Sequence, residues 1–306
     1  MSTVPDLRGR LAIITGGAKG IGLSTSRAFA RLGAAVLIAS RDEAAAQTAA
    51  EGINREVGAN RVTRISLDLS SFDSIRRVAQ ELKDRPVDVL INNAGVMGGD
   101  FRRTNEGFEW HFGVNFMGPF LLSRLLANNL ADGRNPRLVQ LSSGAHRFAA
   151  FNFEDHNFDT EPYNGDIAYQ RSKTACALFA VGFQTHYARL GIDAFSVAPG
   201  IVKTDLLSAM DSATLDRLLI DCAPLVRTAD QAAATILYAA TAPELTGNGG
   251  LYIEDGAPAK PGRPEGLDGV MPHAVDPVAA DRLWQLAERL VRQPPRSTLA
   301  ADSGRV

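Results

Sequence analysis

The sequence predicts an α/β fold, namely a Rossmann-like, doubly wound parallel sheet of about seven strands with helices on both faces. Short apolar runs alternate along the chain with longer stretches of helical periodicity, and no internal repeat interrupts this order. Strands that alternate with helices typically form a parallel sheet covered on both faces. Right-handed crossover connections then wind the sheet in both directions.

The expected elements follow one another in a simple order. Strands are expected at 11–14, 36–39, 62–67, 87–91, 137–141, 192–197 and 250–253. Helices are expected at 21–32, 42–57, 71–83, 105–115, 120–130 and 167–190. Gly33 and Gly191 follow two of these helices, where a left-handed residue commonly ends a helix. Ser70 or Ser71 can cap the helix at 71–83.

We expect residues 1–255 to form one Rossmann-type domain and residues 256–306 to form a Gly- and Pro-rich tail. In the tail, 277–292 has a helical pattern and 294–306 is expected to fray. Residues 201–228 are expected to form a substrate lid, whose leucines either cover the substrate or pack as an amphipathic helix. The aromatic residues of the irregular segment 148–166 either line the substrate site or anchor the segment.

Composition excludes several classes of protein. The chain has 306 residues, of which 45% are hydrophobic and 22% charged, so it is globular rather than disordered. Its 32 Lys and Arg against 34 Asp and Glu give a net charge of −2, which disfavours nucleic-acid binding. No apolar run approaches bilayer thickness, and residues 1–6 do not resemble a signal peptide. Cys176 and Cys222 form no CxxC pair, which favours a cytoplasmic location without structural zinc.

The turn after the first strand reads Thr-Gly-Gly-Ala-Lys-Gly-Ile-Gly over residues 15–22. Glycines at 16, 20 and 22 permit a tight turn and a close approach of the backbone to a pyrophosphate. The helix that follows presents N–H groups to the negative charge. The spacing is G-x-x-x-G-x-G rather than G-x-G-x-x-G, so a plain Gly-rich turn is the alternative for this motif taken alone.

The second strand ends at Ala39-Ser40-Arg41, and the first acidic residue after its apolar run is Asp42. A loop that binds NAD usually has an acidic residue near this point for the ribose hydroxyls. Arg41 can instead bind a 2′-phosphate, and Lys19 can add a second positive charge. We therefore expect a preference for NADP(H), with NAD(H) as the alternative cofactor. The competing interpretation makes both cations solvated surface residues.

Tyr169 and Lys173 are four residues apart and share one face of the expected helix. A free tyrosine titrates near 10, and a neighbouring ammonium favours the phenolate, which suits acid–base catalysis. Pairs at this spacing are common by chance, so the other motifs decide their meaning.

The motifs occur in a characteristic order. After the Gly-rich turn come Asn-Asn-Ala-Gly at 92–95, Ser-Ser at 142–143, the Tyr/Lys pair, and Pro-Gly at 199–200. Together they resemble the short-chain dehydrogenase/reductase family over about residues 8–255. The segments 115–122 and 142–146, with the long stretch before Tyr169, are most similar to the retinol-dehydrogenase-like branch. Phe116 and Pro119 stand where that branch often has histidines, which weighs against a retinoid substrate.

The resemblance implies a catalytic tetrad of Asn115, Ser143, Tyr169 and Lys173. Tyr169 would be the general acid/base, and Lys173 would tune it and hold the cofactor ribose. Ser143 would hydrogen-bond the reacting oxygen, with Ser142 structural, and Asn115 would help hold a water that links Lys173 to solvent. The resemblance also implies cofactor contacts from Gly16, Lys19, Gly20, Ile21, Gly22, Ser40, Arg41, Asp68, Leu69, Asn93, Ala94, Gly95, Tyr169, Lys173, Pro199, Gly200, Val202 and Thr204.

The sequence therefore predicts an NADP(H)-dependent oxidoreductase that transfers hydride reversibly between nicotinamide and a carbonyl or secondary alcohol of an apolar small molecule. A non-catalytic NADP-binding sensor and a C=C reductase on the same fold are the alternatives. Related proteins often form dimers or tetramers, so the resemblance implies a homodimer or a homotetramer, unless the insert before Tyr169 or the tail blocks the interface. The acidic residues between 154 and 161 lack a spacing that would fix a metal, so no metal site is expected. His111 is expected to pack or to hydrogen-bond rather than to catalyse. His146 follows Ser143 closely, but no G-x-S-x-G motif surrounds that serine, so hydrolase chemistry is not expected.

Overall fold

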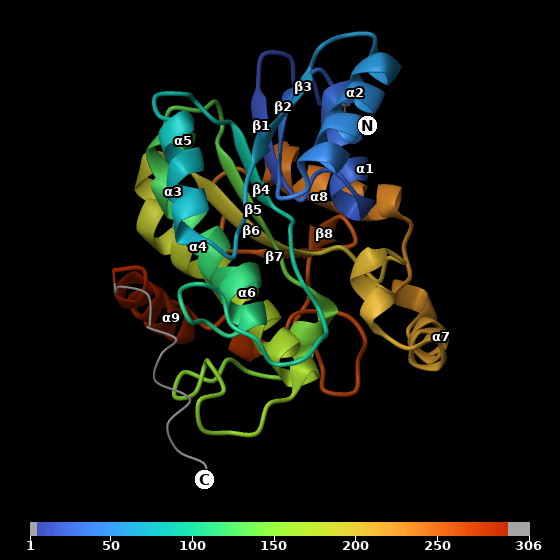
Figure 1. The fold of residues 1–306 in the computed structure, drawn as a ribbon, viewed down its shortest axis with the longest axis vertical. Coiled ribbons are helices and arrows are strands. Elements are labelled where there is room, and N and C mark those ends of the chain that lie inside the picture. The colour runs from blue at the N-terminus through green and yellow to red at the C-terminus, as the bar shows by residue number, and fades with distance from the viewer. Residues whose placement is uncertain (1–4, 293–306) are drawn as a thin grey trace.

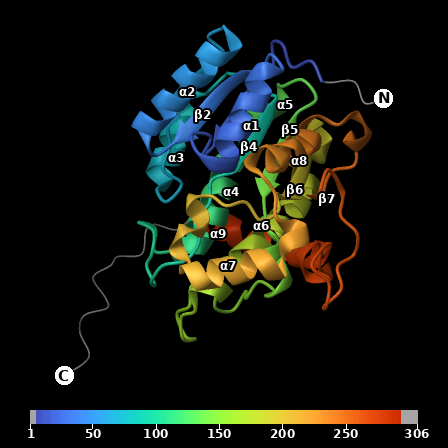
Figure 2. The same cartoon turned by 90° about the vertical axis from the view of Figure 1, so that its right-hand side faces the viewer.

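A central sheet lies between two layers of helices in the computed structural model, which describes residues 5–292 (Figures 1 and 2). Its eight strands have the order β3-β2-β1-β4-β5-β6-β7-β8. The first seven run parallel, and β8 pairs with β7 in antiparallel orientation. The predicted fold class is confirmed. The count of about seven strands was one short, because the edge strand β8 has two residues and no apolar run.

The strands lie close to the expected apolar runs. They are β1 Leu11–Thr15, β2 Ala35–Ser40, β3 Val62–Ser66, β4 Val89–Asn92, β5 Arg137–Leu141, β6 Asp193–Ala198, β7 Tyr252–Glu254 and β8 Ala257–Pro258. All residues of β1, β4, β5 and β6 are buried. Central strands of a parallel sheet read as continuous apolar runs because helices cover both of their faces.

The helices are α1 Gly20–Arg31, α2 Glu43–Val57, α3 Phe72–Glu81, α4 Gly118–Leu125, α5 Ala127–Ala131, α6 Gly165–Tyr187, α7 Ser212–Asp221, α8 Ala229–Thr241 and α9 Pro277–Leu290. Asp42 caps α2 by accepting from the N–H of Ala45, and Ser71 rather than Ser70 caps α3. Helix α8 was not expected from the sequence, although Thr228 and Gln231 form a capping box at its start.

The prediction of a helix at 105–115 is wrong over the first half of that range. Arg103 and Glu109 pair as an isolated β-bridge, and Gly107 between them has a φ of +86°. The helical stretch begins at Trp110 and winds as a π-helix over Phe112–Met117 before α4. A Cβ on Gly113 would overlap the methyl group of Thr104, so the turn packs directly on this helix. The helix expected at 120–130 is divided into α4 and α5.

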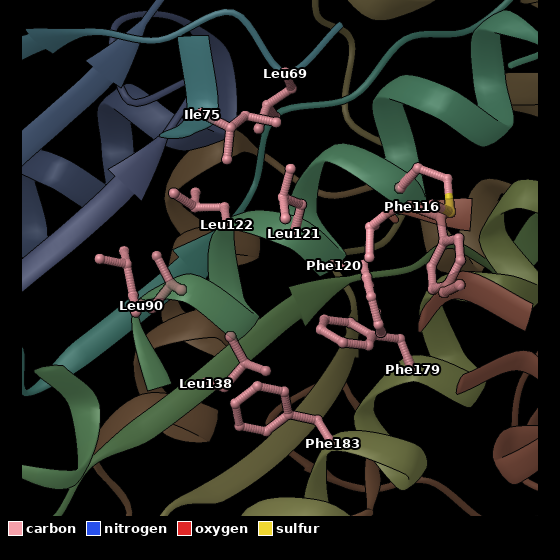
Figure 3. Close-up of a cluster of buried hydrophobic side chains, with 14 of the residues drawn as sticks. Leu69, Ile75, Leu90, Phe116, Phe120, Leu121, Leu122, Leu138, Phe179 and Phe183 are labelled. Atoms are coloured by element: carbon pink, nitrogen blue, oxygen red, sulfur yellow. The ribbon is translucent and has the colours of Figure 1, made fainter. Parts of the chain in front are cut away.

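Alternate side chains of the strands build two cores. Ile14 and Ile38 face α1, α2 and α8, whereas Ile13 and Leu37 face α3, α4, α6 and α9. Figure 3 shows part of the second core, where Leu90 and Leu138 of the sheet lie near the leucines of α4 and the phenylalanines of α4 and α6. This packing fixes α6, the helix that carries Tyr169 and Lys173, against the sheet.

The chain beyond β7 packs on the same sheet and core. Helix α9 lies along α6, and its Trp284 contacts Phe120, with ring centroids 4.9 Å apart, and stacks on His186 at 4.2 Å. Trp284 is only 6% exposed. Residues 256–292 are therefore joined to the sheet by β8 and to the core by α9. The end expected to fray, 294–306, lies outside the described residues.

Residues 201–228, the expected lid, leave the sheet after β6 and return before α8. Backbone hydrogen bonds of 2.9 Å join Ile201 to Leu225 and Arg227 to Ile201, and these bonds close the base of the excursion. The guanidinium of Arg227 also pairs with Asp255 at 2.6 Å. No residue of α7 is buried, and Ile220 is 74% exposed. Figure 1 shows α7 apart from α9, so it does not pack on that side of the body.

Candidate active site

The carboxyl ends of β1 and β4 meet where the strand order reverses, which is the usual ligand position in an open α/β sheet. Asn93, just after β4, crosses to β1 and donates from Nδ2 to the carbonyl of Thr15 at 2.8 Å. The N–H of Ala94 donates to Thr15 Oγ1 at 3.0 Å. These bonds lock the Gly-rich turn to the 92–95 turn.

The Gly-rich turn has a shape that fits a dinucleotide pyrophosphate. Gly16 and Gly20 have φ of +65° and +52°, and a Cβ on Gly22 would overlap the carbonyl oxygen of Gly16. The side chain of Lys19, the N-cap of α1, makes no capping hydrogen bond. The first N–H groups of α1, from Gly20 to Gly22, are therefore open to an anion.

Two cations and one carboxylate meet at the end of β2. Lys19 Nζ lies 3.0 Å from Asp42 Oδ2, and Arg41 is exposed beside them. The hydrogen bond from the Ala45 N–H, followed by that from Lys19, lowers the pKa of Asp42 below its ordinary value. Ser40 Oγ accepts from the Asp42 N–H at 3.2 Å. The sequence indicated both cations but not the pairing of Lys19 with Asp42.

The remaining predicted cofactor residues lie on neighbouring loops. Asp68 Oδ1 accepts from the N–H and the hydroxyl of Ser70, while the side chain of Leu69 is buried in the core. Gly200 has a φ of +82° after Pro199, and Val202 is buried. A Cβ on Gly20 would lie 3.1 Å from Thr204 Cγ2, so the loop after β6 faces the Gly-rich turn.

Lys173 is buried beside Tyr169. Its Nζ lies 5.6 Å from the centroid of the tyrosine ring and donates to the carbonyl of Leu141 at 3.3 Å. Tyr169 is half-buried near the start of α6, which Asn164 caps by accepting from the N–H of Ile167. The pair is thus held at the end of β5, where the two serines follow.

The two serines differ in what they bind. Ser142 Oγ is buried and donates to the carbonyl of Lys173 at 2.8 Å. Ser143 Oγ accepts from the N–H of Ala145 at 3.2 Å and is only half-buried. A hydroxyl that accepts can still donate, so Ser143 is the serine whose O–H can reach a ligand.

Asn115 lies in the π-helix and joins three parts of the site. Its Oδ1 accepts from the Val96 N–H at 2.7 Å, and its Nδ2 donates to the hydroxyl oxygen of Ser172 at 2.9 Å. A Cβ on Gly95 would lie 3.2 Å from Asn115 Oδ1 and 3.5 Å from Lys173 Nζ. π-Turns inside helices frequently mark functional sites. The four predicted catalytic residues therefore share one region at the carboxyl edge of the sheet.

The long segment between Ser143 and Tyr169 is anchored by buried aromatic residues and by hydrogen bonds to the body of the protein. Phe151 and Phe158 are buried, whereas Phe148 is 73% exposed. Asp155 accepts hydrogen bonds from three successive N–H groups, those at 159, 160 and 161, so its carboxylate shapes a turn.

His111 forms a hydrogen bond with Glu109 Oε1 at 2.8 Å, and its ring lies 6.1 Å from that of Tyr169.

A model of the family described as short chain dehydrogenase matches residues 10–214. The chain belongs to the short-chain dehydrogenase/reductase family. It is 40% identical to human polyprenol dehydrogenase, over 81% of this chain and 78% of that one. It is 36% identical to human retinol dehydrogenase 13, over 95% of this chain and 86% of that one. These relatives agree with the retinol-dehydrogenase-like branch.

A solved structure of similar fold covers nearly the whole chain. An uncharacterised protein from Mycobacterium paratuberculosis superposes with a TM-score of 0.74 at 31% identity, covering 96% of this chain and 97% of that one. The family match and the dehydrogenase relatives make this protein an NAD(P)-dependent short-chain dehydrogenase/reductase. Within residues 5–292, no helix is long and apolar enough to cross a membrane.

Proposed function

We propose that this enzyme prefers NADP(H) and interconverts a carbonyl group and an alcohol on an apolar small molecule. The main support for the proposal is the position of Lys173 Nζ. It lies 5.6 Å from the centroid of the Tyr169 ring and donates to the carbonyl at the end of β5, the strand that Ser143 follows. One acid–base group, one cation and one hydroxyl are what a carbonyl oxygen needs when its charge changes.

The cofactor, when bound, supplies or accepts the hydride. In the reducing direction Ser143 donates a hydrogen bond to the substrate oxygen, and Tyr169 gives that oxygen its proton. Lys173 stabilises the negative charge left on the phenol oxygen. Asn115 holds the 95–96 turn against α6 through Val96 and Ser172. Lys173 would pass a proton to the Tyr169 phenolate, and a water beside Asn115 would return a proton from solvent to Lys173.

The apolar substrate is supported by the lid and by the relatives. Leu215, Leu218 and Leu219 of α7 are half-buried and Ile220 is exposed, so α7 offers apolar side chains that the body of the protein does not cover. Two relatives are named for polyprenol and retinol, which are apolar alcohols.

A homologous series of ketones and aldehydes, assayed with NADPH and with NADH, tests the proposed function. We expect kcat/KM to rise about fourfold with each added methylene until the apolar surface is filled, because each buried methylene contributes about 0.8 kcal/mol. The reverse reaction is expected to show the same trend, with secondary alcohols matching the ketones and primary alcohols matching the aldehydes. Cofactor binding without turnover of any member would favour the non-catalytic sensor. A kcat/KM that does not change along the series would contradict the proposed preference for apolar substrates.

Replacing Arg41 by Asp tests the cofactor preference. The ratio of kcat/KM with NADPH to that with NADH is expected to fall by about 10–100-fold, since hydrogen bonds to charged groups contribute about 1.5–3 kcal/mol. Arg55→Asp, on the exposed side of α2, makes the same charge change away from the site and serves as the control. An unchanged ratio in the Arg41 variant would contradict a contact between Arg41 and the 2′-phosphate.

A further inference from the structure

The backbone of Ser143 is held by two buried side chains that no part of the proposed reaction uses. Its carbonyl oxygen accepts from His146 Nδ1 at 2.7 Å and from the hydroxyl of Tyr252 at 3.2 Å. His146 is fully buried, and Tyr252 is nearly so. The bond from the His146 ring forms only when Nδ1 carries the proton, whereas the backbone N–H of His146 donates to the same carbonyl at 3.1 Å in either tautomer.

Met271, which lies far along the chain, determines which nitrogen of His146 carries the proton. The N–H of Met271 donates to His146 Nε2 at 3.2 Å, so this nitrogen is the acceptor and Nδ1 is the donor. Burial, with a smaller contribution from the nearby guanidinium of Arg147, lowers the pKa of His146 to about 4. The ring is therefore neutral at physiological pH, and its tautomer follows from these two hydrogen bonds.

The segment that contains Met271 is firmly docked on the Ser143 loop. The guanidinium of Arg147 donates to four backbone carbonyls, which belong to Arg263, Gly266, Asp268 and Gly269. His273 Nε2 donates to the carbonyl of His146 at 2.9 Å, and that carbonyl also accepts from Thr174 of α6. The docked segment thus connects the serine loop to the helix that carries Tyr169 and Lys173.

We propose that residues 260–273 act as a positioning segment that sets the tautomer of His146 and thereby the place of Ser143 beside Tyr169. This inference rests on the proposed role of Ser143. Misplacement of a catalytic group by about 1 Å can cost about 10²-fold in rate even when the change lies outside the reacting atoms. A segment that served stability alone would leave kcat unchanged in variants that fold.

The Met271→Pro variant removes the N–H that donates to His146, together with the methionine side chain, whose sulfur lies near Gly262. Met271 already has φ −73° and ψ 142°, which a proline adopts without strain, and the preceding Val270 is extended in a β-bridge. Met271→Leu keeps the N–H and is the matched reference. We expect kcat about tenfold lower in the proline variant than in the leucine variant, with KM for NADPH equal within about twofold.

Two further measurements do not depend on turnover. The ¹⁵N chemical shifts of His146 are expected to report one tautomer in Met271→Leu and a mixture in Met271→Pro. The amide of Ala145, which donates to Ser143 Oγ, is expected to exchange faster with solvent in the proline variant. If the wild type turns over no carbonyl substrate, the proposed function fails, and these two measurements still decide whether the segment positions Ser143.

A second pair of variants covers the case in which Met271→Pro does not fold. His146→Asn places an amide N–H near the position of Nδ1, whereas His146→Leu offers no donor. The proposal requires the Asn variant to retain a higher kcat than the Leu variant. Equal kcat and equal Ala145 exchange within each pair of folded variants would overturn it.

Discussion

Replacing Tyr169 by Phe is expected to lower kcat by about 10²–10⁴-fold, the range supplied by a positioned acid–base group. The substitution removes one oxygen and leaves the ring, which lies beside Lys173 Nζ and the ring of His111. Cofactor affinity is expected to stay close to that of the wild type, because the phenol oxygen acts on the substrate. Cofactor absorbance measures turnover, and calorimetric titration measures binding.

Tyr238→Phe is the matched control, since Tyr238 lies on α8 and packs against the core on the opposite face of the sheet. It is expected to keep normal turnover. Near-normal activity in the Tyr169 variant would show that another group moves the proton. Loss of cofactor binding in that variant would assign Tyr169 to cofactor binding instead.

Replacing Trp284 by Ala is expected to lower the free energy of unfolding by about 3–5 kcal/mol, as large-to-small changes at buried aromatic residues do. The indole lies against Phe120 and Phe179 in the core and stacks on His186 at the surface. Its removal leaves a cavity between α9 and α6 that neighbouring rings fill only in part. Urea denaturation, followed by circular dichroism, measures the change in the free energy of unfolding.

Val278→Ala provides the comparison on the same helix, because Val278 is 77% exposed. Its effect is expected to stay within about 0.5 kcal/mol. A loss below about 1 kcal/mol for the Trp284 variant would mean that α9 contributes little to the stability of the core. A separate early transition in the wild type would indicate that α9 unfolds on its own.

The strands were predictable because the centre of a parallel sheet is buried on both faces and reads as an uninterrupted apolar run. Helix starts were predictable where a capping side chain marks them, as Asp42 and Ser71 do. The bridge of Arg103 with Glu109 and the π-turn after it depend on tertiary packing around Gly107 and Gly113, which no local pattern encodes. The lone β8 pairing is too short to leave a signal in the sequence.

The site follows the same division. The motif residues could be assigned to one edge because the carboxyl ends of parallel strands converge there. The pairing of Lys19 with Asp42 and the hydrogen bond from Met271 to His146 join residues 23 and 125 positions apart. Such contacts depend on side-chain geometry that forms only after folding. The residues could therefore be predicted from the sequence, but their hydrogen-bond partners could not.

The two ends of the segment 201–228 are hydrogen-bonded to each other, and this has an evolutionary consequence. Because Ile201 and Val226 pair there, and Arg227 is fastened to Asp255, the residues between them begin and end at one fixed point. Lengthening a surface loop whose ends are already joined costs little free energy. Descendants of this chain could exchange the whole insert for another of different size or polarity, and so acquire new substrates, while the hydride-transfer apparatus stayed untouched.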